Sequence, residues 1–210
     1  MSKDSYWDKY YDLTSSAANP SQFAAFVLGE FSDYSSFVDL GCGNGRDSLF
    51  FAHFGKTVFG VDASDIAIQK CQKAADDLGI KNADFALLDF NNSVACEYFV
   101  SQHAARLKNS ILYSRFFLHA IDEEAEKIFL QTTKSLIGDR GKLCLEFRTT
   151  RDENLKKVTQ KHYRRYIDSA KFLAHISELG FSCDYFCEGF GFAKYKSDDA
   201  YVARLVISNA

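Results

Sequence analysis

The order of apolar and amphipathic segments constrains this fold more than any other feature. Short apolar runs bounded by Gly, Asn or Asp alternate with longer segments of helical periodicity, without an internal repeat. Such alternation predicts a parallel sheet whose strands are joined by helices. We interpret as strands residues 36–40, 56–62, 83–88, 109–118, 141–147, 181–187 and 201–207. Helices are expected at 45–54, 64–78, 93–107, 122–137 and 169–179.

These elements predict a doubly wound α/β fold. Its sheet has seven strands and is mostly parallel, with a C-terminal antiparallel hairpin and helices on both faces. A chain of 210 residues is expected to form one domain, residues 1–210, because it is long enough to bury a full core. In such sheets ligands lie beyond the carboxyl ends of the strands, so residues that follow strands are the functional candidates.

Composition excludes several other classes of protein. One Pro and 47% hydrophobic residues argue against disordered and collagen-like chains. No apolar stretch is long enough to span a bilayer, and the polar first twelve residues do not resemble a signal peptide, so we expect a cytoplasmic protein with no membrane partner. The six Cys residues show no C-x-x-C pair and no zinc-site spacing, which predicts free thiols and no metal site.

A glycine-rich turn follows the first strand, with the sequence Asp-Leu-Gly-Cys-Gly-Asn-Gly-Arg-Asp at 39–47. Glycines allow a tight turn and a close approach of ligand to backbone, and the next helix offers unpaired N–H groups. Asp62 ends the second strand, where an acid can accept hydrogen bonds from two ribose hydroxyls. Together they indicate an adenosine-type ligand. A dinucleotide fingerprint would place its third Gly at Arg46, so NAD and FAD are disfavoured.

The segment Val38–Gly45 resembles the acid-x-Gly-x-Gly-x-Gly motif of class I S-adenosylmethionine-dependent methyltransferases. The resemblance extends over essentially the whole chain, and residues 43–49 are similar to small methyltransferases of the tellurite-resistance and thiopurine type. It implies S-adenosyl-L-methionine as cofactor. The cofactor-binding residues that it implies are Asp39, Gly41, Cys42, Gly43, Gly45, Asp62, Ala63, Asp89, Phe90 and Arg115.

Within that set the roles differ. The turn borders the methionine portion, Asp62 holds the ribose, and Asp89 with Phe90 contacts the adenine, with Ala63 beside the ring. A surface position at a strand end is the alternative for Asp89. Asp39 either organises the turn or approaches the cofactor's ammonium group through water.

Two histidines are the candidate catalytic bases. His119 lies in a segment that resembles the family's Leu-His-x-Ile-x-acid pattern, which lines both cofactor and substrate. It is interpreted first as a wall residue and second as a base, because His often only packs. His162 is the other candidate, with Tyr163 or Tyr166 as orienting groups.

The substrate side is predicted from two segments. Residues 1–35 are interpreted as an N-terminal helical lid whose aromatic residues close over the cofactor, or alternatively as a terminal helix that packs on the sheet. Residues 148–168 form a substrate-recognition insertion. The candidate substrate-binding residues are Tyr10, Tyr11, Arg148, Tyr163, Arg164 and Arg165.

The distribution of charge indicates the type of substrate. Residues 140–175 hold ten Lys or Arg against four Asp or Glu in a chain of net charge −3. Arg side chains bind carboxylate and phosphate groups in a forked geometry, so we expect a small, anionic metabolite or surface-glycan precursor; a solvated charged surface is the alternative. RNA is disfavoured because the patch is short and the chain is acidic. A non-catalytic adenosine-ligand or interaction module and an RNA methyltransferase stay as alternatives. Neither the acceptor atom nor the oligomeric state has a signature in the sequence.

Overall fold

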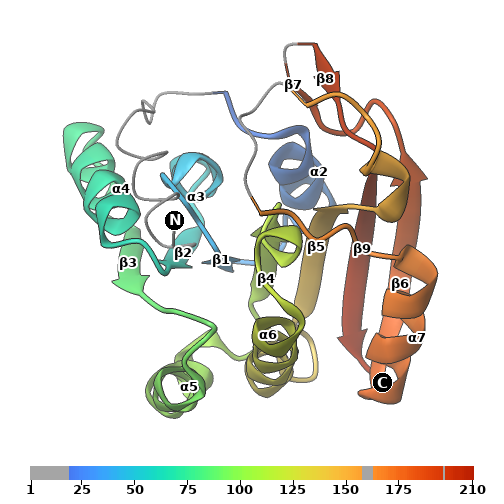
Figure 1. The fold of residues 1–210 in the computed structure, drawn as a ribbon. Coiled ribbons are helices and arrows are strands. Elements are labelled where there is room, and N and C mark those ends of the chain that lie inside the picture. The colour runs from blue at the N-terminus through green and yellow to red at the C-terminus, as the bar shows by residue number, and fades with distance from the viewer. Residues whose placement is uncertain (1–18, 158–162, 196) are drawn as a thin grey trace.

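The computed structural model describes residues 19–157, 163–195 and 197–210. Seven strands form one sheet in the order β3-β2-β1-β4-β5-β9-β6 (Figure 1). Neighbouring strands are parallel except for β9, which is antiparallel to both β5 and β6, and the predicted fold class is therefore confirmed. The strands are β1 (Ser36–Leu40), β2 (Thr57–Asp62), β3 (Ala83–Leu87), β4 (Ile111–Arg115), β5 (Lys142–Arg148), β6 (Phe181–Gly189) and β9 (Val202–Asn209).

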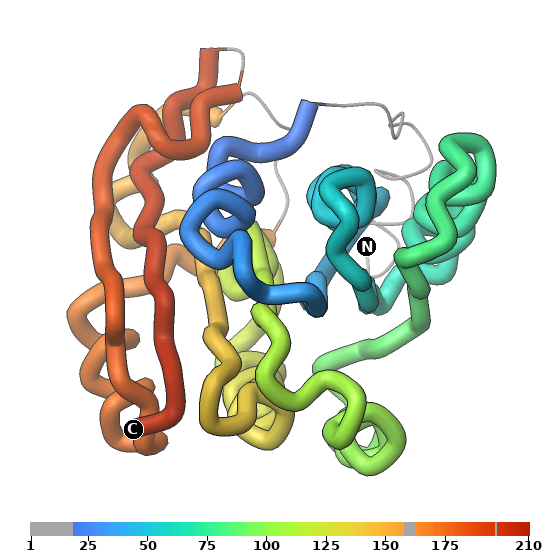
Figure 2. The backbone as a smooth tube through the Cα atoms, turned by 180° about the vertical axis from the view of Figure 1, so that it is seen from behind, coloured from blue at the N-terminus to red at the C-terminus, as the bar shows by residue number. Residues whose placement is uncertain are grey.

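Six α-helices cover the two faces of this sheet in the part of the chain that the structure describes. They are α2 (Gln22–Glu30), α3 (Arg46–His53), α4 (Asp65–Asp77), α5 (Ser93–Leu107), α6 (Glu123–Ile137) and α7 (Ser169–Glu178). Figures 1 and 2 show α2, α3 and α4 on one face and α5, α6 and α7 on the other. No helix among the described residues has the length and apolar character needed to cross a bilayer.

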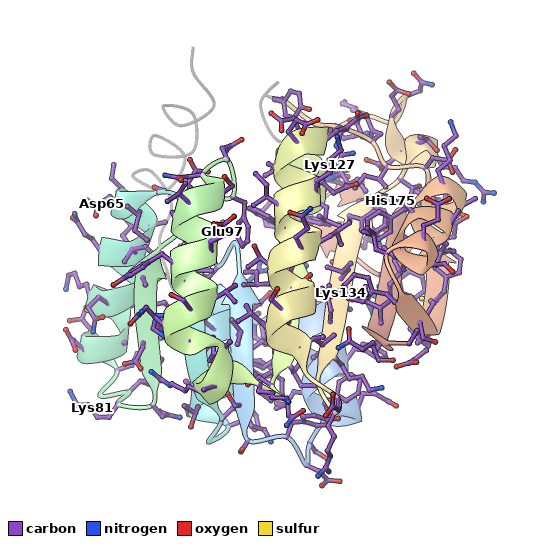
Figure 3. The ribbon with its side chains drawn as sticks, turned by 90° about the horizontal axis from the view of Figure 1, so that it is seen from below. Asp65, Lys81, Glu97, Lys127, Lys134 and His175 are labelled. Atoms are coloured by element: carbon purple, nitrogen blue, oxygen red, sulfur yellow. The ribbon has the colours of Figure 1, made fainter. Side chains whose placement is uncertain are left out.

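Alternate residues of the strands supply a separate core to each face. The core below α2 and α3 includes Phe23, Phe37, Phe51 and Tyr113, and the core below α5, α6 and α7 is the larger. Figure 3 shows α5 and α6 lying side by side, with the exposed residues Glu97 on α5 and Lys127 and Lys134 on α6. Both faces of the central strands β1 and β4 are buried, which explains why apolar residues occupy adjacent positions there, as Phe37 and Val38 do, and do not alternate with polar ones.

The chain leaves β4 earlier than the apolar pattern predicts. The pattern predicts a strand to residue 118, but β4 ends at Arg115, and Leu118–Ala120 form a short 3-10 helix, η1. Phe116 has a φ of 57°, in the left-handed region, and its N–H donates to the Glu146 carbonyl oxygen at 2.8 Å. This turn directs the chain out of the sheet. Residues other than glycine rarely adopt such a φ, and the hydrogen bond to Glu146 supports it at Phe116.

Part of the predicted N-terminal lid is a core element. The sequence analysis assigns all of residues 1–35 to a lid, but Phe23, Ala24 and Val27 of α2 are fully buried against the sheet. The lid prediction is therefore wrong for Gln22–Glu30, and the alternative of a helix packed on the sheet is right there. Aromatic rings bury large apolar areas, and this burial fixes the helix. Tyr10 and Tyr11 lie outside the described residues.

A buried polar cluster joins the start of α2 to the start of α3. Ser21, the N-cap of α2, accepts a hydrogen bond from Ala24 N–H, and its hydroxyl and N–H donate to the Asp47 carboxylate, both at 2.8 Å. The Tyr113 hydroxyl donates to the same carboxylate at 2.7 Å. Burial opposes ionisation of Asp47, but the positive charges of Arg46 and Arg115 hold its pKa below the usual value, and the Ser21 N–H contributes.

Replacing Ser21 by Ala removes an N-cap and a partner of a buried carboxylate together. We expect Ser21→Ala to lower the free energy of unfolding by about 3 kcal/mol. Asn92→Ala is the matched control because Asn92 caps α5 at the surface, and it should cost about 1 kcal/mol. Urea denaturation measures both values. Equal losses would contradict a structural role for the Ser21–Asp47 bonds.

Candidate active site

The glycine-rich turn lies at the carboxyl end of β1, between β2 and β4. Gly41, Gly43 and Gly45 all have positive φ, which glycine adopts without the strain that other residues incur. A Cβ on Gly41 would lie 2.4 Å from the Phe117 ring, and one on Gly45 would lie 2.8 Å from the Cys71 sulfur. The turn is therefore packed closely against the protein at Gly41 and Gly45, and a side chain at either position would displace it.

Asp62, at the end of β2, is bound to this turn. Its Oδ2 accepts the Gly43 N–H at 2.9 Å, and its Oδ1 accepts the Ser64 N–H at 2.9 Å. The residue is half-buried. A carboxylate oxygen accepts more than one hydrogen bond, so bonds to the backbone are compatible with bonds to ligand hydroxyls. The glycine turn and the acid that the sequence assigns to the ribose thus lie in direct contact, and they fit an adenosine ligand.

Asp39 lies beneath the turn and is 3% exposed. Its carboxylate accepts a hydrogen bond from the Ser48 hydroxyl at 2.5 Å. Burial raises the pKa of Asp39 from 3.8 to about 7; the Ser48 bond lowers it, and the negative charges of Asp47 and Asp62 raise it further. This structure supports the role of Asp39 in organising the turn.

Cys42 also packs beneath the turn, beside Cys71. The Cys71 thiol donates to the Gly43 carbonyl at 3.1 Å, and the Cys42 thiol contacts the same carbonyl at 3.9 Å. A hydrogen bond with Cys71, together with burial, raises the pKa of Cys42 well above its usual value. Cys42 is therefore a neutral thiol that supports the backbone of the turn.

The two residues predicted at the adenine end lie in different surroundings. Asp89 is half-buried after β3, and its Oδ1 accepts both the N–H and the side-chain amide of Asn91 at 2.8 Å. The Phe90 ring is 2% exposed and packs on Phe117 and Phe129. That ring belongs to the hydrophobic core and is not available to adenine, so the predicted contact of Phe90 with adenine stays a prediction for its backbone alone. Ala63 is exposed beside Asp62.

Arg115 and His119 follow β4 at the same edge of the sheet. The Arg115 Nε donates to Glu146 at 2.7 Å. His119 is 4% exposed, and its Nδ1 accepts the Arg148 N–H at 3.4 Å. A backbone hydrogen bond to a ring nitrogen fixes the orientation of the imidazole. This arrangement favours the wall role of His119 over that of a base.

The structure contradicts the prediction that Arg148 clamps a substrate. Its guanidinium donates to Asp152 at 2.6 Å and to Asp198 at 2.9 Å, and the residue is 6% exposed. The Lys157 ammonium lies 3.1 Å from the same Asp152 carboxylate. Arg148 instead joins the end of β5 to the loop after it and to the short strand β8 (Asp198–Asp199), which pairs with β7 (Lys194–Tyr195) in a separate hairpin.

Arg165 is likewise committed to the protein itself. Its guanidinium donates to the Glu126 carboxylate and to the carbonyl oxygens of Leu118 and Ile121. The prediction that it binds substrate is therefore wrong, since its donors hold the segment around His119 in place. Arg164 is half-buried and Tyr163 is 44% exposed, so both stay predictions, and His162 lies outside the described residues.

A separate cavity of about 380 Å³ lies where the insertion meets the carboxyl ends of β5 and β6. It is bounded by Thr149, Thr150 and Arg151 on one side and by the start of α7 on the other. Arg151 at its rim contacts the Tyr201 hydroxyl at 2.6 Å and Glu188 at 3.3 Å. The cavity contains no residue of the glycine turn and no Asp62, so it is distinct from the adenosine site.

Sequence reasoning missed three charged residues around the site: Asp47, Glu146 and Arg204. Glu146 and Arg204 are 1% and 6% exposed, and each interrupts an otherwise apolar strand. That interruption was a usable signal, because a charge in a buried strand needs a partner. Register identifies the partner: Arg115, Glu146 and Arg204 lie opposite one another on β4, β5 and β9.

The raised pKa of Asp39 predicts a specific dependence of stability on pH. The pKa is about 7 in the folded protein and 3.8 as the reference value. The folded state therefore binds the proton more tightly, and stability is lost as the pH rises through 7. Asp39→Asn removes this titration. We expect the unfolding free energy of the variant relative to wild type to rise by about 3 kcal/mol between about pH 4.5 and pH 8.

Urea denaturation across that pH range measures the difference. Asp84→Asn, at an exposed ion pair with Arg106, is the control and should show no comparable change with pH. Parallel pH profiles for wild type and Asp39→Asn would contradict the raised pKa.

Arg148 forms buried ion pairs, so we expect that replacing it lowers the stability of the protein. Arg148→Ala leaves Asp152 and Asp198 buried with one fewer cation, and we expect a loss of about 3 kcal/mol in unfolding free energy. Arg151→Ala, in the same loop but exposed, should change stability little. Thermal and urea unfolding test both variants. An Arg148→Ala protein of wild-type stability would restore the clamp hypothesis.

Comparisons with known proteins agree with this geometry. A methyltransferase domain family matches residues 32–171, more than half of the chain. A structure of an S-adenosylmethionine-dependent methyltransferase from Anabaena variabilis is 21% identical with a TM-score of 0.72, covering 100% of this chain and 96% of its own. A TehB-like S-adenosylmethionine-dependent methyltransferase from Corynebacterium glutamicum is 15% identical with a TM-score of 0.68, covering 99% and 98%.

A third structure comes from work on the conversion of a disulfide bond into a thioacetal group during echinomycin biosynthesis. It is 15% identical with a TM-score of 0.74 and covers 99% of this chain and 92% of its own. The search of curated protein sequences found no significant match. At these identities the solved structures show the fold, and the family match shows the family. The chain belongs to the methyltransferase domain family, and it has the class I, Rossmann-like fold of S-adenosylmethionine-dependent methyltransferases.

Proposed function

We propose that this methyltransferase transfers the methyl group of S-adenosyl-L-methionine to a small molecule that carries an anionic group. One observation supports the cofactor above all others: the Asp62 carboxylate is bound to the Gly43 N–H at 2.9 Å. That bond brings the candidate ribose acceptor and the glycine-rich turn to one point at the carboxyl edge of the sheet. Ligands of doubly wound sheets bind at this edge.

The chain's contribution to the cofactor site is binding and orientation. When bound, S-adenosylmethionine supplies a methyl group that is already activated by a positively charged sulfur. Asp62 accepts the ribose hydroxyls, the outer side of the turn faces the methionine portion, and Asp89 lies at the adenine end. Asp39 and Asp62 place two carboxyl groups near the turn, which suits a ligand with cationic groups.

Catalysis of methyl transfer depends chiefly on alignment. The reacting atoms must be held about 3–3.5 Å apart and in line, and positioning alone lowers such a barrier substantially. His119 lies at the correct edge of the sheet, and its Nδ1 accepts from the Arg148 backbone. We therefore assign His119 a positioning role in the wall of the site. A base role for His162 stays a prediction.

The charges near the site favour a small substrate over RNA. Two of the insertion's basic residues, Arg148 and Arg165, are occupied by carboxylates inside the protein. They contribute no basic surface, whereas nucleic-acid binding requires a broad one to contact the phosphate backbone. A small molecule with a single anionic group needs only one correctly placed cation.

The fold also supports a different reaction in a related structure. A [4+2]-cyclase has the same fold, with a TM-score of 0.69 and 13% identity, covering 94% of this chain and 85% of its own. A chain of this fold that bound the cofactor without transferring its methyl group is therefore the second candidate. Methyl-transfer assays with a library of phosphorylated and carboxylated metabolites, followed by mass spectrometry, distinguish the two candidates.

The first test of the proposed function is cofactor binding. S-Adenosylhomocysteine should bind the wild-type protein in calorimetric titrations, and Asp62→Ala should weaken that binding at least about tenfold because it removes two charge-assisted hydrogen bonds. Asp65→Ala, at an exposed position on the first turn of α4, is the control and should bind as wild type does. Absence of binding to the wild type, or unchanged binding by Asp62→Ala, would refute the assignment.

A further inference from the structure

We propose that Arg115 binds the anionic group of the methyl acceptor, a carboxylate or a phosphate, and that Glu146 and Arg204 hold its guanidinium in place. The inference rests on the proposed function and identifies the residue at which the acceptor's charge is recognised. It also replaces two expectations from the sequence. Those expectations assigned Arg115 to the cofactor and the anion to Arg148.

Three neighbouring strands hold Arg115 in place. Arg115, Glu146 and Arg204 lie opposite one another on β4, β5 and β9. Glu146 accepts the Arg115 Nε at 2.7 Å on one oxygen and the Arg204 Nε at 2.7 Å on the other. Arg204 also donates to the Phe192 carbonyl at 2.8 Å. Each side chain is therefore anchored to the rigid sheet, which is what precise ligand recognition requires.

Arg115 uses only part of its set of N–H donors within the protein. Only its Nε takes part in a hydrogen bond within the described residues, so its two terminal nitrogens have no partner there. The guanidinium lies 4.1 Å from the centre of the Phe116 ring, which covers one of its flat faces. The side chain is 16% exposed. The unused terminal pair of N–H groups has the geometry that binds a carboxylate or phosphate through two parallel hydrogen bonds.

The charged groups around Arg115 also favour a bound anion. The charged groups linked to Arg115 are the guanidinium groups of Arg46, Arg115 and Arg204 and the carboxylates of Asp47 and Glu146. Asp39 is linked to Asp47 and Arg46 as well, so the cluster carries one excess positive charge while the Asp39 carboxyl, whose pKa is about 7, holds its proton. Arg204 alone would neutralise Glu146, so a purely structural pair would not need Arg115. A bound anion removes the excess, and burying an uncompensated charge is costly.

The sheet order separates this anion site from the adenosine site. The residues that fit the cofactor follow β1, β2 and β3, whereas the partners of Arg115 are on β5 and β9. β4 lies between β1 and β5, so an anion on Arg115 belongs to a molecule on the far side of the turn from Asp62. That is where a methyl acceptor would face the methionine end of the cofactor.

The experiment titrates sodium acetate and inorganic phosphate into the full-length protein with and without saturating S-adenosylhomocysteine. The readouts are calorimetry and the NMR signals of the arginine Nε–H groups. The variants are Arg115→Gln and Arg115→Lys, and Arg106→Gln at an exposed ion pair is the matched control. Lys keeps a positive charge beside Glu146 but lacks the forked pair of N–H groups, so it separates loss of recognition from loss of folding. Thermal melting checks each variant.

We expect the wild type loaded with S-adenosylhomocysteine to bind one of the two anions. Both Arg115 variants should weaken that binding at least about tenfold, and Arg106→Gln should leave it unchanged. Three results would overturn the proposal: no anion binding to the loaded wild type, equal binding by the Arg115 variants, or anion binding that saturating S-adenosylhomocysteine abolishes. The last would assign Arg115 to the cofactor's carboxylate. Failure of S-adenosylhomocysteine itself to bind would refute the proposed function, while the titrations without it still test Arg115.

Discussion

The hydrogen bond between the Gly43 N–H and the Asp62 carboxylate is the interaction on which the arrangement of the site depends. It joins the turn after β1 to the end of β2. The turn can donate this bond because its glycines adopt positive φ, with Gly41 packed directly on Phe117 and Gly45 on Cys71. The parallel pairing of β1 with β2 and β4 then brings Asp39, Asp62 and Arg115 to one edge of the sheet.

Buried charge divides this edge into two regions. Acidic groups gather at β1 and β2, where burial raises the pKa of Asp39 to about 7. Basic groups gather at β4, β5 and β9, where Arg115 and Arg204 share Glu146. A cationic cofactor and an anionic acceptor would therefore meet complementary charges on the two sides of the turn. Two basic residues of the insertion, Arg148 and Arg165, form ion pairs with internal carboxylates and fix the loops.

The strand and helix order followed from hydrophobic periodicity, and the glycine turn with Asp62 followed from spacing. These features are local, because each depends on residues adjacent in sequence. The misassigned residues each have at least one partner that is distant in sequence. Arg148 has the composition of an anion clamp, but Asp152, four positions away, and Asp198, fifty positions away, neutralise it. Phe90 follows a strand, where ligand-binding residues are expected, but its ring packs on Phe129 in the core.

The sequence by itself therefore determined the doubly wound fold, the position of the cofactor turn and the acid that pairs with it, since backbone geometry and hydrophobic pattern are local properties. Only the tertiary structure decided which arginines are available for a ligand. Charge on a side chain is visible in the sequence, but whether that charge is already neutralised depends on pairing between strands. Arg148 forms ion pairs with two internal carboxylates, whereas Arg115 shares a single carboxylate with Arg204. This difference distinguishes a structural cation from a candidate binding group.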